Sequence, residues 1–244
     1  MDQNVALNYV RRRKRKKRAA IVSGISAIGI TILLIIAFCL IYVDRFTITT
    51  VNEPGLCLTI DENKLETCTE LAAPPLPKAW NIQYSDIPEN IDENLGSKNF
   101  DGFINERRIS YFAYSFYLKG VSENAGELIS YKVSLDINKE TRESKLFPAI
   151  KIMIIRNGER VVYSDENALE LYDGIPGTST KTKIDGIQII PFEDSDYIIV
   201  RSYKIESGDF DKYTVVMWID GWESSDPMRG GTFNAKLKFS TAIN

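Results

Sequence analysis

The sequence predicts an all-β protein, an antiparallel β-sandwich of Ig-like or jelly-roll-like type, behind one N-terminal transmembrane helix. An apolar segment at residues 19–43, directly after a basic tail, predicts the membrane span. Roughly eight short apolar segments follow, with period-two alternation and turns rich in Gly, Asn and Asp, and these predict the sandwich. From residue 80 onward no stretch has a helical period long enough to indicate a helix instead.

Residues 19–43 contain no Asp, Glu, Lys or Arg. At about 1.5 Å per residue they can cross a hydrocarbon core of roughly 30 Å. A cleaved signal peptide has a shorter apolar region that ends in small residues, whereas this one ends in Phe-Cys-Leu-Ile-Tyr-Val. We therefore expect an uncleaved signal anchor that contacts membrane lipid.

The tail at residues 1–18 carries eight basic side chains and one acidic side chain, a charge of +7. This predicts a cytoplasmic tail and an extracellular C-terminal domain at the cell membrane, crossed once. The 201 residues after the anchor hold the other 22 basic and 32 acidic groups, a charge of -10, which disfavours nucleic acid as a partner. The side chains expected to contact anionic headgroups are Arg11, Arg12, Arg13, Lys14, Arg15, Lys16, Lys17 and Arg18.

Residues 44–77 are predicted to form a membrane-proximal segment. Residues 45–51 alternate apolar and β-branched polar side chains and predict a short strand. Cys57 and Cys68 are the cysteines of the expected exterior, where conditions permit disulfides, so we predict that they pair; two separate thiols are the alternative. Three prolines at residues 74–77 favour a stiff spacer, so we predict that the sandwich domain follows it and comprises residues 78–244.

The first part of that domain contains three predicted features. Trp80, Ile82 and Tyr84 alternate as on one face of a strand, and residues 86–107 are acidic and resemble a loop. Residues 109–120 are aromatic on both faces and predict a central, buried strand.

Residues 128–137 show clear period two, and residues 149–155 form an apolar run for both faces of a sheet. Asn157 and Gly158 then precede RVVYS, and this dipeptide between apolar runs predicts a tight hairpin. The last third adds four predicted strands, with the sequences GIQIIPF, DYIIVRSYKI, DKYTVVMWID and TFNAKLKFS.

The chain contains no histidine, which excludes Ser-His-Asp and Cys-His catalysis. A Ser-Lys dyad stays formally open, although no motif points to one. Glycine-rich phosphate loops are absent from the sequence, so no cofactor is expected. Two external cysteines serve zinc poorly, and acidic runs such as residues 193–196 favour solvated turns over calcium sites. We therefore assign no catalytic, cofactor or metal residues.

Asp220 and Glu223 flank Trp222, and this is the carboxylate pair that we would test for glycoside hydrolysis. The simpler interpretation is a polar loop with Trp218 in the core and Trp222 at its rim. An aromatic ring beside acidic groups also suits contact with carbohydrate or protein. We therefore treat Trp222, Asp220 and Glu223 as a candidate surface contact.

Four stretches, at residues 79–87, 115–135, 148–159 and 211–239, resemble exported surface proteins of Firmicutes. In the last stretch the features are Tyr-Thr, an apolar run, Trp-Ile-Asp-Gly, an acidic loop and a Gly-Gly strand. The group is distantly similar to the fibre-forming sandwiches of TasA and camelysin. The resemblance covers residues 78–244 and implies a sandwich at the surface of a Gram-positive bacterium, with no catalytic residues to transfer.

The leading hypothesis is a non-catalytic, membrane-tethered surface module with an envelope protein as its partner, bound through a sheet edge. A second hypothesis is an accessory subunit of a membrane complex, because small residues at positions 23–29 of the anchor would allow close helix packing. The third is a hydrolase of cell-wall polymer or peptide.

Overall fold

The computed structural model describes residues 46–50, 55–61, 68–73, 79–94, 100–103, 109–174, 181–224 and 233–241. These residues fall in one compact unit, Arg45–Asn244, and are mostly β-sheet, so the predicted all-β class is confirmed. The predicted tail at residues 1–18 and the predicted anchor at residues 19–43 lie outside the described residues. Within the described ranges, no helix is long and apolar enough to cross a membrane.

Two sheets organise the described part of the chain. One has five strands in the order β13-β7-β15-β1-β3. Their bounds are Tyr197–Glu206, Leu128–Ile137, Ala235–Thr241, Thr47–Thr50 and Glu70–Ala72. We call it the five-stranded sheet.

The other sheet, called the larger sheet, has the order β12-β9-β8-β14-β6-β2, with β4 beside β14 and β5 beside β6. The bounds, in that order, are Gln188–Pro191, Glu159–Ser164, Ile150–Arg156, Phe210–Asp220, Ile109–Gly120, Leu56–Thr59, Asn81–Ile82 and Phe100–Phe103. A small ladder joins β10 and β11, and short helices lie between strands. These are β10 (Tyr172–Asp173), β11 (Thr182–Lys183), η1 (Tyr84–Asp86), α2 (Ile91–Asn94), α3 (Lys139–Arg142) and η2 (Phe147–Ala149).

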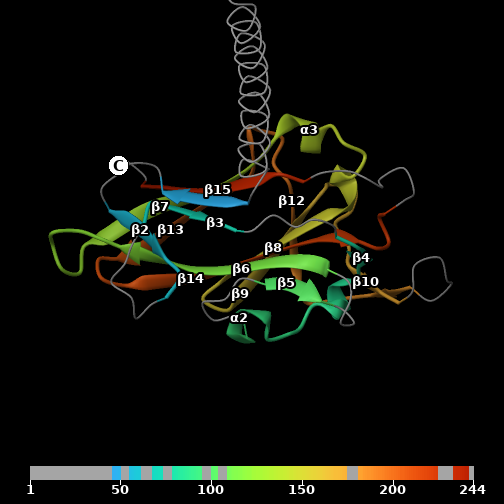
Figure 1. The fold of residues 1–244 in the computed structure, drawn as a ribbon, viewed down its shortest axis with the longest axis horizontal. Helices are drawn as coiled ribbons and strands as arrows, with labels where there is room; N and C mark the ends of the chain where they lie inside the picture. Colours follow the sequence, from blue (N-terminus) through green and yellow to red (C-terminus); the bar gives the residue numbers. More distant parts are fainter. Residues whose placement is uncertain are drawn as a thin grey trace, which may run out of the picture. The chain divides into compact units, whose positions relative to one another are not determined.

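The main core lies between the two sheets. Ile48, Val133 and Leu237 of the five-stranded sheet and Phe116 and Val215 of the larger sheet belong to one buried cluster. Figure 1 shows the two layers, with β15 in one and β6 in the other. Burial of these aliphatic and aromatic side chains is the main stabilising contribution to the fold.

The larger sheet also buries its second face. On β14, Tyr213 and Val215 point into the main core, whereas Val216 and Trp218 belong to a second cluster. The segments at residues 82–91 and 184–189 cover that second face. Two-sided burial explains why the sequences of the central strands are continuous apolar runs. The prediction of a buried strand is confirmed for its described side chains, residues 111–118.

Several predicted strands are confirmed in place and type. Strand β7 buries Tyr131, Val133, Leu135 and Ile137 on alternate positions. Strands β8 and β9 form an antiparallel hairpin whose turn residues, Asn157 and Gly158, have φ values of 49° and 87°. Both turn positions need positive φ, which is why Asn-Gly occupies them.

The sheets are mixed, so the prediction of a purely antiparallel sandwich is wrong. Strand β1 runs parallel to β15, β12 runs parallel to β9, and β4 runs parallel to β14. The alternation of apolar and polar residues indicates which face of a strand is buried. It does not indicate whether the neighbouring strand runs parallel or antiparallel.

The predicted boundary before residue 78 is also corrected. Strands β1 and β3 pair with each other in the five-stranded sheet, and β2 pairs with β6 in the larger sheet. The segment predicted as membrane-proximal therefore contributes strands to the same fold. Its prolines at residues 74–77 lie outside the described residues.

The predicted disulfide is not formed in the structure. An isolated antiparallel bridge pairs Cys68 with Leu58, and the Cys68 thiol donates to the Leu58 carbonyl at 3.6 Å. Directly paired residues share a face, so Cys68 lies on the face of Leu58 and Cys57 lies on the opposite one. The register, which spacing alone does not reveal, separates the two sulfur atoms.

Trp80, Ile82 and Tyr84 do not share a strand face, in contrast to the prediction. Strand β4 has two residues, and the 3-10 helix η1 begins at Tyr84. The backbone N–H of Gln83 donates to the Asp86 carboxylate at 2.9 Å, which stabilises the helical turn.

Candidate functional site

The turn after β14 holds the three residues singled out in the sequence. Asp220 is 2 % exposed, and its Oδ1 accepts hydrogen bonds from the backbone N–H groups of Trp222 at 2.8 Å and Glu223 at 3.4 Å. The N–H of Gly221 donates to the Ile82 carbonyl at 2.9 Å. Asp220 therefore positions the turn from inside the fold, in contrast to its predicted place in a surface contact. Burial raises the pKa of its carboxyl, against the opposing hydrogen bond from Trp222 and the charge of Lys151.

Trp222 is half-buried and faces two groups from another part of the chain. Its ring centroid lies 6.4 Å from that of Tyr172, with the ring planes inclined at 64°. The Lys181 ammonium nitrogen lies 3.5 Å from the Tyr172 centroid and 5.3 Å from the Trp222 centroid. Both distances are within the range of cation–π attraction. We call Tyr172, Lys181 and Trp222 the aromatic clamp.

A cavity of about 360 Å³ adjoins the aromatic clamp. Glu170 accepts a hydrogen bond from the Tyr172 hydroxyl and forms an ion pair with Lys183 at 2.9 Å. Glu223, predicted as a contact residue, does reach this cavity. The residues lining it are Glu166, Asn167, Ala168, Leu169, Glu170, Tyr172, Lys181 and Glu223.

Sequence reasoning missed Tyr172 and Lys181. They lie on or beside the two-residue strands β10 and β11, which pair Tyr172 with Lys183. No local pattern marks so short a ladder, and nothing in the sequence links it to the turn after β14.

A buried lysine also stands out in the larger sheet. Lys151 of β8 is fully buried, and its Nζ donates to Ser164 Oγ at 2.6 Å and to the Ala168 carbonyl. Burial lowers the pKa of Lys151, and the nearby charge of Asp220 opposes this shift. The one sequence signal for this group is a lysine inside the apolar run of residues 149–155.

This is the pair of groups that a Ser-Lys dyad needs, but it is inaccessible. Ser164 has no exposed surface, and its hydroxyl donates to the Ala168 carbonyl at 2.8 Å. A nucleophile must reach its substrate, so the geometry favours a structural role in which Lys151 holds the turn at residues 165–168.

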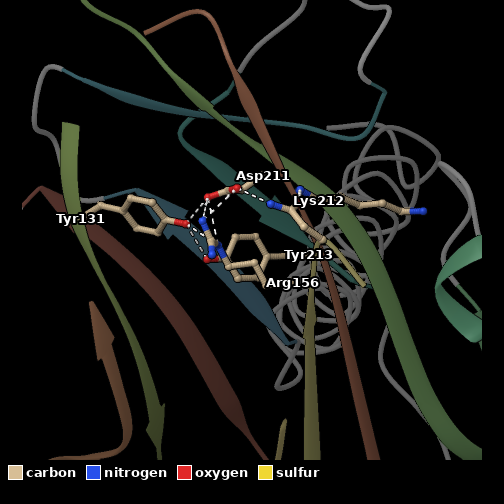
Figure 2. Close-up of polar contacts among 6 residues, drawn as sticks. Tyr131, Arg156, Asp211, Lys212 and Tyr213 are labelled. Carbon is tan, nitrogen blue, oxygen red and sulfur yellow. Dashed lines mark hydrogen bonds and ion pairs between the residues drawn. The ribbon is translucent and has the colours of Figure 1, made fainter. Parts of the chain in front are cut away.

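Figure 2 shows a second polar network, between the sheets. Asp211 of β14 accepts from Arg156 Nε at 3.1 Å and from Arg156 Nη2 at 2.9 Å, and from the Tyr131 hydroxyl. Tyr131 comes from the five-stranded sheet and lies 2.7 Å from the Tyr213 hydroxyl. Desolvation raises the pKa of both phenols, which therefore stay protonated donors. The network joins the two sheets.

Strand β13 forms one edge of the five-stranded sheet. Within the described residues it pairs with β7 and with no other strand. The N–H of Ser207 donates to Glu127 at 2.8 Å, on the β7 side, while the Ile198 carbonyl accepts from Glu193 at 2.8 Å, on the outer side. Backbone groups alternate along a strand, so Val200, Ser202 and Lys204 direct theirs outward.

No group of three acidic or cysteine side chains with metal-binding geometry occurs in the part of the chain that the structure describes. In the acidic run at residues 193–196, Arg142 donates to the carbonyls of Ser195 and Asp196. These contacts suit a turn held by backbone bonds.

Comparison with protein-family models finds no match for this chain. No curated protein and no solved structure matches it either. The functional assignment therefore depends on the geometry above.

Proposed function

We propose that the chain is a membrane-tethered extracellular binding module without catalytic activity, which takes up a strand of an envelope protein at the outer edge of β13. The observation that carries this proposal is the length and openness of that edge. The outer edge is open from Val200 to Lys204, about 17 Å, which is long enough for several backbone hydrogen bonds to an added strand.

The open groups on this edge are specific. Arg201 Nη1 donates to the Val200 carbonyl at 3.0 Å, which leaves the Val200 N–H and both backbone groups of Ser202 and Lys204 directed outward. Ser202 and Lys204 are exposed, so a partner strand can reach them. Charged side chains on an edge reduce nonspecific pairing, and Arg201 and Lys204 favour an acidic or polar partner strand.

The absence of histidine from the sequence and the burial of Ser164 and Lys151 support a non-catalytic role. The charge of +7 at residues 1–18 and the apolar run at residues 19–43 support the tether, with the domain outside the cell. The resemblance to exported sandwich proteins agrees with this arrangement and adds no catalytic group.

The test is cross-linking of the full-length chain in native membranes, with mass-spectrometric identification of captured neighbours. Ser202→Pro removes an outward N–H without touching the β7 ladder, and Ser202→Ala is the matched control. The proposal predicts a neighbour captured by the wild type and by Ser202→Ala but lost with Ser202→Pro. The same neighbours in all three samples would contradict binding at this edge, provided that near-UV circular dichroism shows all three folded.

A further inference from the structure

We propose that the aromatic clamp and the cavity beside it form a binding site for an aliphatic ammonium group, and that Lys181, which lines the cavity, holds the cation position over the rings as an intramolecular stand-in for that ligand. The site is separate from the β13 edge and does not depend on it.

The geometry of the bound cation carries the argument. Two aromatic rings lie within 6 Å of one ammonium nitrogen, at 3.5 Å and 5.3 Å from their centroids, and the rings meet edge to face. Two rings around one ammonium form the type of cage that proteins use for ammonium ligands. The cavity of about 360 Å³ falls within the usual range for small-ligand sites.

The charge around the cavity has the sign that a cation requires. Glu166, Glu170 and Glu223 line it, and among the described lining residues Lys181 is the one cation. Lys183, outside the lining, is paired with Glu170, so Glu166 and Glu223 supply most of the negative charge. Displacement of Lys181 by an external ammonium would leave this charge balance unchanged. An anion would instead face three carboxylates.

Hydrogen bonds to a buried carboxylate hold the turn that carries Trp222. Asp220 Oδ1 accepts hydrogen bonds from the backbone N–H groups of Trp222 and Glu223 and so holds this turn in place. The Trp222 indole N–H is buried without a hydrogen-bond partner among the described residues. Lys181 itself is exposed, so it can leave without opening the core. By contrast, Lys119 lies 5.1 Å from the single ring of Phe210 and is not among the residues that line this cavity.

If Lys181 competes with the ligand, its removal must strengthen binding. Two cation–π contacts at a partly exposed site correspond to roughly a tenfold change in apparent affinity. Lys181→Met keeps an unbranched side chain, one atom shorter, and removes its charge. Lys119→Met is the matched control.

The experiment titrates the full-length chain in detergent micelles with n-butylammonium chloride, which reproduces the end of a lysine side chain. The readout is the indole N–H resonance of Trp222, identified with a Trp222→Phe sample; Trp218 serves as the folding control. Sodium chloride at equal ionic strength and n-butanol are run in parallel.

The proposal predicts that Lys181→Met binds n-butylammonium about tenfold more tightly than the wild type and than Lys119→Met. Adding Tyr172→Leu to Lys181→Met should abolish that gain while the Trp218 resonance stays in place. Three results would overturn it: equal affinities in Lys181→Met and Lys119→Met, an equal response to n-butanol, or a gain that survives Tyr172→Leu.

Discussion

Replacement of Asp211 by Asn tests the network that joins the two sheets. The Asp211 side chain is 6 % exposed and that of Arg156 is 21 % exposed, and the two form an ion pair at 2.9 Å. Asn keeps the shape and one acceptor oxygen but removes the negative charge. The Arg156 guanidinium would then remain largely buried without its counterion.

Breaking one side of a buried ion pair destabilises a protein by about 3 to 5 kcal/mol. Because Arg156 retains partial contact with water, we expect about 3 kcal/mol for Asp211→Asn. For a domain of this size, that corresponds to a decrease in Tm of roughly 6 to 12 °C.

The assay is thermal unfolding of the full-length chain in detergent, followed by near-UV circular dichroism. Glu143→Gln is the control, because the Lys139–Glu143 pair is 84 % and 67 % exposed. Such a pair contributes less than about 1 kcal/mol. If Asp211→Asn and Glu143→Gln lowered Tm equally, the reasoning on the buried network would be refuted.

Three further perturbations test the fold. Burial lowers the pKa of Lys151, so between that lowered pKa and 10.5 the unfolded chain binds more protons than the folded chain. The stability of the wild type should therefore rise with pH in this window, and the Tm of Lys151→Met should not show this rise. A Cβ at Gly120 would lie 2.6 Å from the Glu206 carbonyl oxygen, so Gly120→Ala should lower the free energy of unfolding in urea by about 1 to 3 kcal/mol. Asn157 has a φ of 49°, and its side-chain amide donates to the Asp211 carboxylate at 2.6 Å. Asn157→Ala should therefore lower the free energy of unfolding by about 2 kcal/mol, and Asn157→Gly should lower it less because glycine adopts positive φ without strain. The same dependence of Tm on pH in Lys151→Met and the wild type would contradict the first prediction. An unchanged free energy of unfolding in Gly120→Ala would contradict the second, and equal losses of stability in the two Asn157 variants would contradict the third.

Local signals in the sequence explain the strands that were predicted correctly. Alternation in β7 is visible because one of its faces is buried, and the Asn157-Gly158 turn is visible because its backbone requires positive φ. Both features depend on neighbouring residues alone.

Long-range pairing explains what the sequence did not reveal. The parallel pairing of β1 with β15 joins opposite ends of the domain, and the register of Cys68 with Leu58 keeps the two cysteines apart. Likewise, the sequence predicts a surface contact at Trp222, but the groups that face its ring, Tyr172 and Lys181, lie on or beside a ladder of four residues. Tertiary pairing of this kind has no signature at the level of local period or composition.

Residue-level amide hydrogen exchange on β13 tests the proposed binding mode most directly. The amides of Val200, Ser202 and Lys204 should exchange rapidly in the purified chain and slowly in native membranes, where a partner strand covers them. Those of Arg201 and Tyr203, which point toward β7, should be protected in both samples. Equally rapid exchange of the three outward amides in native membranes would contradict strand addition at this edge.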